Sequence, residues 1–201
     1  MLQSLNDAEN GVDVISGICV KSHFVKHTWR SVYDHNGLNH VQYPRVISPF
    51  PFYYWLWTHP QSWVDLCGRG HDPCRVMALV SHFFKIVQFV SLFSVSTISW
   101  PPPFYFWPLF IAGQFLNFRV YQLLGESGTY YGVRFGKNVP WVTEFPFGVI
   151  KDPQYVGSIM SLAACLSWVP FFYILLWVLG YIFIILVESK EDPATRAKPH
   201  S

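Results

Sequence analysis

Hydrophobic and polar positions divide the chain into two parts of different character. Residues 1–47 are polar and contain no sustained apolar period. From Pro49 onward the sequence consists mainly of aromatic and aliphatic residues. We therefore expect residues 1–47 to be a polar, poorly ordered extension and residues 48–201 to form one domain.

Two apolar stretches in the second part have the length of a single membrane span. Met77–Trp100 and Phe104–Leu124 are each close to the ~20 residues that a spanning helix needs. The prolines at 101–103 separate them, because a helix does not readily continue through consecutive prolines. A weaker stretch, Phe50–Leu66, is interrupted by His59, Pro60 and Asp65, and it predicts an interfacial or partial span.

The longest apolar stretch, Tyr155–Val187, is too long for one span. As a single helix it would measure roughly 50 Å, against a hydrocarbon core of ~30 Å. Trp168–Pro170 lies near its middle and predicts a turn. The pattern thus indicates an all-α integral membrane protein with about four apolar helices, one of them weak and the last two a short hairpin. The hairpin would bring Glu188 close to Asp152 and Tyr155.

Composition and charge support this interpretation. Hydrophobic residues make up 51% of the chain and charged residues only 13%, about half the usual share in globular proteins. The net charge of +2 is too small to indicate nucleic-acid binding. The turns Trp100–Pro103 and Trp168–Pro170 carry no charge, whereas the opposite ends of the helices are basic, which predicts that the basic ends face the cytosol. These ends hold Arg69, Arg75, Arg134, Lys137, Lys151, Lys190, Arg196 and Lys198.

Polar residues within the apolar stretches are candidates for a site. Gln114, Asn117 and Tyr121 fall on one helical face, with Gly113 beside them. Such residues often mark a functional site in a membrane helix, but hydrogen bonding between helices is an equally good interpretation. Cys67-x3-His71-x2-Cys74 lacks a fourth ligand and the usual zinc spacing, so no metal site is expected.

Several longer motifs make the chain resemble a known family. The motifs are Trp100–Pro103, Gly113–Tyr121, Gly128–Gly132, Val142–Phe147, Asp152–Gly157 and Glu188–Pro193. In this order they resemble the plant phospholipid N-methyltransferases. The resemblance runs from about Pro49 to the C-terminus, is densest after Trp100, and does not include residues 1–47.

The resemblance implies a function and a location. It implies methyl transfer from S-adenosyl-L-methionine to the head-group amine of phosphatidyl-N-methylethanolamine and of its dimethyl form, giving phosphatidylcholine. It also implies a multi-pass protein of the endoplasmic reticulum membrane with its active site facing the cytosol. Two alternatives remain open: an enzyme like isoprenylcysteine carboxyl methyltransferase, and a non-catalytic membrane protein that binds lipids.

Site residues follow from matching the family motifs position by position. The family's Gly-x-Gly element falls on Gly113-Gln114-Phe115, which lacks the second glycine, and its pair of adjacent glutamates falls on Glu188-Ser189, which keeps only the first. The resemblance therefore predicts cofactor contacts at these positions and at Asn117, Pro153 and Gly157.

A second group of candidates concerns the substrate. Alkylammonium groups titrate near ~10, so a proton must be removed before the amine can attack a methyl group. Glu144 and Asp152 are the candidates for handling that proton, with Tyr155 beside them.

Overall fold

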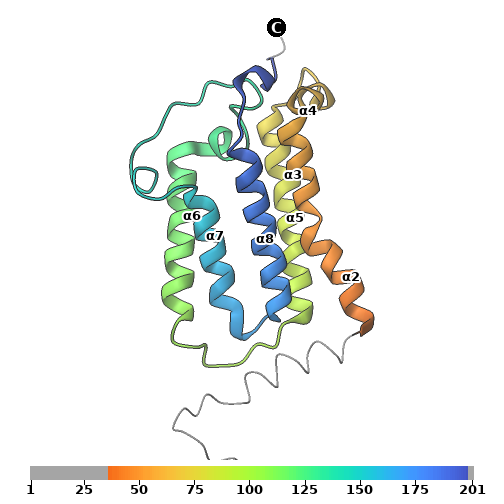
Figure 1. The fold of residues 1–201 in the computed structure, drawn as a ribbon, viewed down its shortest axis with the longest axis vertical. Helices are drawn as coiled ribbons and strands as arrows, with labels where there is room; N and C mark the ends of the chain where they lie inside the picture. Colours follow the sequence, from red (N-terminus) through yellow and green to blue (C-terminus); the bar gives the residue numbers. More distant parts are fainter. Residues whose placement is uncertain (1–35, 199–201) are drawn as a thin grey trace, which may run out of the picture.

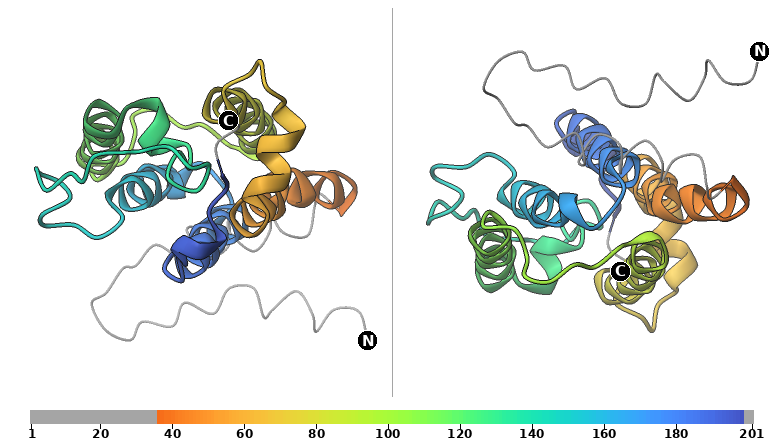
Figure 2. Two further views of the ribbon diagram at one scale, coloured as in Figure 1. Left: turned by 90° about the horizontal axis from the view of Figure 1, so that it is seen from above. Right: turned by 90° about the horizontal axis from the view of Figure 1, so that it is seen from below.

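The computed structural model describes residues 36–198, and every regular element in this range is helical (Figure 1). The helices run in the order α2 (Asn36–Ile47), α3 (Pro49–Thr58), α4 (Pro60–Cys67), α5 (Pro73–Val95), α6 (Phe106–Thr129), α7 (Pro153–Ala164) and α8 (Phe171–Glu188), with short 3₁₀ turns η2 (Cys165–Ser167) and η3 (Pro193–Thr195). Figure 2 shows α6 and α7 next to each other on one side of the bundle, with α2, α3 and α4 on the opposite side.

Prolines determine where three of the helices begin. Pro49, Pro60 and Pro73 each lie in the first turn of their helix, where a missing backbone N–H costs nothing. Asp72 caps α5, because its side chain accepts a 2.9 Å hydrogen bond from the Cys74 N–H. These signals divide the weak Phe50–Leu66 stretch into two short helices, α3 and α4.

Helix α2 differs from the expectation for the N-terminal part. Gln42 and Val46 are buried, and the ring of Tyr43 stacks on Tyr173 at 4.7 Å. Gln88 Nε2 of α5 donates to the Val46 carbonyl oxygen at 2.7 Å. Residues 36–47 are thus an ordered helix, held by isolated contacts that leave no apolar period in the sequence. Residues 1–35 lie outside the described range, and the domain boundary at residue 48 stays a prediction.

The central core lies around α8. Its buried side chains include Tyr173, Ile174, Trp177, Tyr181 and Ile184, which pack with Val46, Phe50, Leu92 and Leu162 of the surrounding helices. Helix α8 contacts α2, α3 and α7. The last helix therefore serves as the centre against which the others pack.

The predicted hairpin is confirmed. Helices α7 and α8 are separated by a turn at Trp168–Pro170, which contacts the turn between α5 and α6: the Thr97 N–H donates to the Trp168 carbonyl at 2.8 Å, and Trp168 Nε1 donates to the Ser99 carbonyl at 3.1 Å. The two uncharged turns therefore lie at one end of the bundle. The segment after α6 and the C-terminal tail lie at the other end (Figure 1).

Fewer helices than expected meet the requirements for a full span. Within the described residues, α5 and α8 are long and apolar enough to cross a membrane. Helix α7 has 12 residues and measures only about 18 Å. Helix α6 has 24 residues but carries Gln114, Asn117 and Arg119, and its backbone is kinked at Gly125.

Candidate active site

A cavity of about 240 Å³ lies at the end of the bundle opposite the uncharged turns. Its lining comes from the end of α3, the second half of α6 and the segment that follows it, the start of α7 and the end of α8. The polar and charged side chains in this lining include Tyr131, Arg134, Asp152, Tyr155, Glu188 and Glu191.

Glu188 is a cavity carboxylate that accepts two hydrogen bonds from tyrosine hydroxyls. The hydroxyl of Tyr131 donates to Glu188 Oε1 at 2.5 Å, and the hydroxyl of Tyr155 donates to the same oxygen at 2.6 Å. Hydrogen bonds to an ionised acceptor are short and strong. The two tyrosines therefore fix the orientation of the carboxylate. Both bind Oε1, and no hydrogen bond to Oε2 is formed within residues 36–198.

Local structure explains how the three residues meet. Glu188 is the last residue of α8, and Tyr155 lies in the first turn of α7, so closure of the hairpin brings them together. Tyr131 follows the end of α6 with a positive φ of 56°. Burial, and then the neighbouring Glu188 carboxylate, raises the pKa of Tyr131 well above its ordinary value. Tyr131 therefore remains a hydrogen-bond donor at neutral pH.

Asp152 is a second carboxylate of the cavity. It precedes α7 with a left-handed backbone (φ 52°, ψ 54°), and its side chain makes no capping hydrogen bond to the helix. Aspartate tolerates this conformation better than most residues. Its carboxylate lines the cavity.

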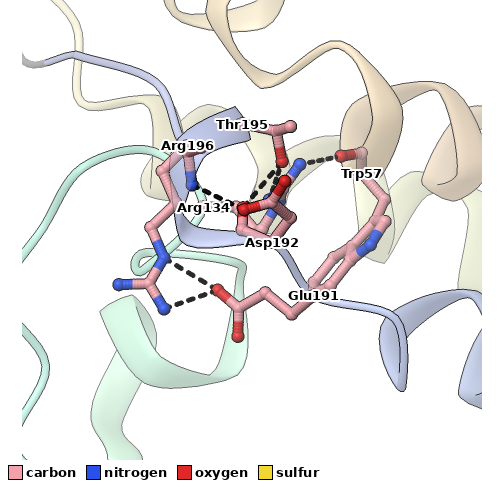
Figure 3. Close-up of polar contacts among 7 residues, drawn as sticks. Trp57, Arg134, Glu191, Asp192, Thr195 and Arg196 are labelled. Atoms are coloured by element: carbon pink, nitrogen blue, oxygen red, sulfur yellow. Dashed lines mark hydrogen bonds and ion pairs between the residues drawn. The ribbon is translucent and has the colours of Figure 1, made fainter.

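Arg134 forms the wall of the cavity next to the C-terminal tail (Figure 3). Its side chain is 3% exposed and stacks over the ring of Trp57 at 4.7 Å. Its guanidinium donates to the Trp57 carbonyl, to Thr195 Oγ1 at 2.9 Å and to the Asp192 carbonyl at 3.3 Å. The backbone of Arg134 also accepts a 2.8 Å hydrogen bond from the Ala197 N–H, so the tail is tied to this residue.

Four predicted cofactor residues lie in the contact between α6 and α7. A Cβ at Gly113 would lie 2.5 Å from the Gly157 carbonyl oxygen, and a Cβ at Gly157 would lie 2.7 Å from the Gly113 carbonyl oxygen. Gln114 Nε2 donates to Ser161 Oγ at 2.9 Å, and Asn117 Oδ1 is buried beside Gly157. These residues allow two helices to pack closely, which is the interhelical interpretation left open by the sequence.

Three other predicted residues are absent from the cavity lining. Glu144 is 69% exposed and pairs with Arg119 at 3.2 Å. Phe115 is exposed and stacks on Phe145, and the Ser189 hydroxyl donates to the Leu186 carbonyl at 2.8 Å. Of the predicted site residues, Asp152, Pro153, Tyr155 and Glu188 line the cavity together.

The cavity lining also includes residues outside the predicted site set, among them Trp57, Tyr131, Arg134 and Glu191. Tyr131 belongs to one of the motifs that carry the family resemblance. Arg134 was counted only among the basic residues that set the orientation. Trp57 lies in the weak apolar stretch, where nothing in the sequence indicates a site.

The metal interpretation finds no support in the part of the chain that the structure describes. No group of three histidine, cysteine or acidic side chains there could hold a metal ion. Cys67 and Cys74 are free, and burial raises the pKa of the Cys67 thiol.

Comparisons with known proteins agree on one family. A family model described as phospholipid methyltransferase matches residues 105–198, which includes α6 to α8 and every cavity-lining residue except Trp57. The chain is 76% identical over 153 residues to phosphatidyl-N-methylethanolamine N-methyltransferase of Arabidopsis thaliana, covering 76% of this chain and 93% of that enzyme. No solved structure gives a significant match.

Short matches also occur to an unrelated class of protein. The chain is 60% identical over 42 residues to respiratory burst oxidase homolog protein C of Solanum tuberosum, which is 21% of this chain but only 4% of the oxidase. Homolog protein D from the same species is 58% identical over 41 residues, or 5% of its length. Such fragments are too small to define the protein, whereas the methyltransferase match covers nearly the whole relative. The chain therefore belongs to the phospholipid methyltransferase family.

Proposed function

We propose that this chain transfers methyl groups to the head-group amine of phosphatidyl-N-methylethanolamine and of its dimethyl form, giving phosphatidylcholine. The observation that carries the proposal is the 76% identity to a relative with this activity in its name, over 93% of that relative. A second observation supports it: the matched region contains a cavity with several carboxylates. Such a cavity suits positively charged ligands.

The cavity residues fit S-adenosyl-L-methionine as the methyl donor. When bound, it supplies an electrophilic methyl group on a sulfonium, and it also carries an ammonium group. Glu188, held by Tyr131 and Tyr155, presents a free carboxylate oxygen to the cavity. Charge–charge attraction is stronger in a poorly hydrated site than in water. We assign Glu188 the role of binding the positive end of the cofactor.

The α6–α7 residues have an indirect part in this proposal. Gly113 and Gly157 let the two helices approach, and Gln114 and Asn117 lie in the same contact. Close packing here holds α7 against α6. It therefore also positions Asp152, Pro153 and Tyr155, which lie at the start of α7. Phe115 and Ser189, which the family motifs also include, would act at most from outside the cavity lining.

Asp152 is the residue we assign to the substrate proton. The amine is protonated at neutral pH, and its lone pair is freed only when a base takes that proton. Asp152 lines the cavity with a carboxylate that does not cap a helix, whereas Glu144 is exposed and paired with Arg119. In this proposal an Asp152 oxygen accepts the ammonium proton and passes it to water at the cavity mouth.

We further propose that the protein lies in the endoplasmic reticulum membrane, crossing it more than once, with the cavity facing the cytosol. Helices α5 and α8 have the length and apolarity of spans. Their outward faces expose large apolar side chains, such as Leu79, Phe83 and Leu186, as a lipid-facing surface requires. The uncharged turns lie opposite the basic end that contains the cavity (Figure 1).

Expression in cells that lack their own phospholipid methylation tests the function directly. Each head-group form is supplied in turn, and the methylated phospholipids are quantified. The proposal expects phosphatidylcholine from the monomethyl and dimethyl forms. An assay offering a prenylated cysteine and a phospholipid amine side by side should give methyl transfer only to the phospholipid. Methylation of the prenylated cysteine alone would overturn the proposal.

A further inference from the structure

Arg134 carries a buried charge whose hydrogen-bond partners are all neutral. The residue is 3% exposed, and within residues 36–198 its guanidinium donates to the carbonyl oxygens of Trp57 and Asp192 and to the Thr195 hydroxyl (Figure 3). The Nε atom is buried and has no hydrogen-bond partner among the described residues. A buried polar group without a partner is costly, and a buried charge without a counter-charge is more so.

The acidic residues near Arg134 form no ion pair with it in the part of the chain that the structure describes. Among residues 36–198 the ion pairs are Arg119–Glu144, Lys137–Asp72 and Arg196–Glu191. Glu191, the acidic residue of the tail that also lines the cavity, is bound by Arg196 at 2.8 Å. Burial lowers the pKa of the Arg134 guanidinium, and the nearby Glu191 and Asp192 carboxylates offset this only in part.

Arg134 lines the same cavity as Glu188 and Asp152. The cavity thus has one positively charged residue on its tail-side wall and carboxylates at the ends of α7 and α8. Each ligand of the proposed reaction likewise carries both a negative and a positive group. The phospholipid has a phosphodiester beside an ammonium, and the methyl donor has a carboxylate beside its ammonium and sulfonium. A guanidinium forms strong, directed hydrogen bonds with either oxyanion.

We propose that Arg134 provides an oxyanion-binding site in this cavity, which holds the acidic group of one of the two ligands. This inference rests on the proposed function and adds a binding residue to it. The neutral partners fix the guanidinium in place without cancelling its charge. The hydrogen bond to the Asp192 carbonyl, at 3.3 Å, is longer than the 2.9 Å bond to Thr195 Oγ1. It is therefore the contact that an oxyanion would most readily replace.

The competing explanation is that Arg134 only holds the C-terminal tail. Two variants separate these roles. Arg134→Met removes both the charge and the hydrogen bonds to the tail. Thr195→Val removes one hydrogen bond to the tail and leaves the charge, so it is the matched control. Both are made in the full chain, reconstituted in lipid nanodiscs, and their thermal unfolding is compared with that of the unmodified protein.

Two ligand series identify which oxyanion is bound. Dissociation constants are measured for S-adenosyl-L-methionine and for its decarboxylated analogue, and KM is measured for the phospholipid. If Arg134 binds the cofactor carboxylate, Arg134→Met should weaken binding of S-adenosyl-L-methionine roughly ten- to a hundredfold. The affinity for the decarboxylated analogue should then be unchanged. If the phosphodiester binds, KM for the phospholipid should rise by a similar factor, with cofactor affinity unchanged.

Other results would overturn the proposal. The first is that Arg134→Met changes none of the constants more than Thr195→Val does. The second is that Arg134→Met weakens binding of both cofactor forms equally and leaves KM for the phospholipid unchanged. Either result would make Arg134 a purely structural residue.

A test on the unmodified protein covers the case in which Arg134→Met does not fold. Soluble glycerophospho-N-methylethanolamine and N-methylethanolamine are compared as competitors, and the two cofactor forms are compared in direct binding. An oxyanion site requires a clear preference, about tenfold or more, for the phosphate-bearing or the carboxylate-bearing member of a pair. No preference in either pair contradicts the site. Because the binding measurements need no turnover, they separate failure of this inference from failure of the proposed activity.

Discussion

The contact between α6 and α7 and the cavity at the end of α8 both contain polar residues, but they use them differently. In the α6–α7 contact Gln114 binds Ser161, the Gly113 and Gly157 backbones approach each other closely, and the neutral amide oxygen of Asn117 is buried beside Gly157. In the cavity the groups concerned are charged: within the described residues Glu188 is held through Oε1, and the Nε of Arg134 has no partner.

This difference helps to distinguish polar residues that hold helices together from polar residues that bind ligands in an apolar protein. Polar residues that pair across a helix contact fix the positions of helices. Charged residues that are oriented by neighbours but retain free atoms can bind a ligand. On this criterion the α6–α7 contact is a scaffold, and the candidate site is the cavity at the ends of α7 and α8.

The largest effect should come from filling the scaffold contact. Gly157→Val would place a Cβ 2.7 Å from the Gly113 carbonyl oxygen and 3.0 Å from Leu116 Cβ. We expect a loss of about 3 kcal/mol in unfolding free energy, at the upper end of the usual cost of overpacking, measured by thermal unfolding in detergent. Gly70→Ala is the control, because a Cβ there meets nothing within 4 Å. Equal stability of the two variants would show that α6 and α7 do not pack in this way.

A large effect on turnover should come from Asp152→Asn. Asparagine tolerates the left-handed backbone of this position, so the fold should be kept. Loss of a general base typically lowers kcat by about 10²- to 10⁴-fold. The deficit should shrink as pH rises towards the amine pKa near ~10, because the substrate then loses its proton unaided. Should Glu144→Gln be the variant that loses kcat, with Asp152→Asn active, the base has been assigned to the wrong carboxylate.

A smaller effect is expected from Tyr155→Phe. The variant removes one of the two hydrogen bonds that orient Glu188 and leaves Tyr131 in place. One hydrogen bond is worth about 1 kcal/mol, or roughly fivefold in cofactor affinity, which isothermal titration would detect. Tyr121→Phe, at an exposed position on α6, should leave affinity unchanged. A stronger loss in Tyr121→Phe would place the cofactor nearer to α6.

The smallest effect on stability is expected from the ion pair between Lys137 and Asp72, which lies outside both the α6–α7 contact and the cavity lining. Lys137 Nζ lies 2.6 Å from Asp72 Oδ2. Burial alone would raise the pKa of Asp72, but the hydrogen bonds from Lys137 and the Cys74 N–H outweigh it and lower the pKa below its ordinary 3.8. The pair therefore stabilises the fold above pH 3.8, and this stability is lost as pH falls through the lowered pKa.

Thermal unfolding between neutral and acid pH checks this expectation. Lys137→Met should lose part of the acid dependence and only a little stability at neutral pH, because both side chains are about one-third exposed or more. An unchanged acid dependence in Lys137→Met would show that the pair does not stabilise the fold.

The hairpin could be predicted from the sequence because its evidence is local. The length of the apolar stretch and the proline at 170 require a turn, and the turn brings Glu188 next to Tyr155, which the 2.6 Å hydrogen bond confirms. Helix α2 was missed because a few isolated contacts, such as that of Gln88 with Val46, hold it in place. Such contacts leave no periodic pattern in the sequence.

The rest of the site depends on backbone geometry that periodicity does not encode. The chain bends at Gly125, whose φ is 62°, and Tyr131 follows with its own positive φ of 56°. These conformations direct Tyr131 and Arg134 into the cavity. The motif around Gly113 predicts a cofactor contact, and this stays a prediction. In the structure Gly113 lies in the close contact between α6 and α7, which the motif alone does not reveal.

One measurement tests the central claim that the cofactor site is built around Glu188. The dissociation constant of S-adenosyl-L-methionine is determined for the unmodified protein, Glu188→Gln and Gln114→Leu, each in nanodiscs. A charged hydrogen-bonding partner is worth ~1.5–3 kcal/mol, so Glu188→Gln should weaken binding roughly ten- to a hundredfold. Gln114→Leu, which removes only the hydrogen bond to Ser161, should change affinity by less than about threefold. Full affinity in Glu188→Gln together with a large loss in Gln114→Leu would contradict the account and move the site to the α6–α7 contact.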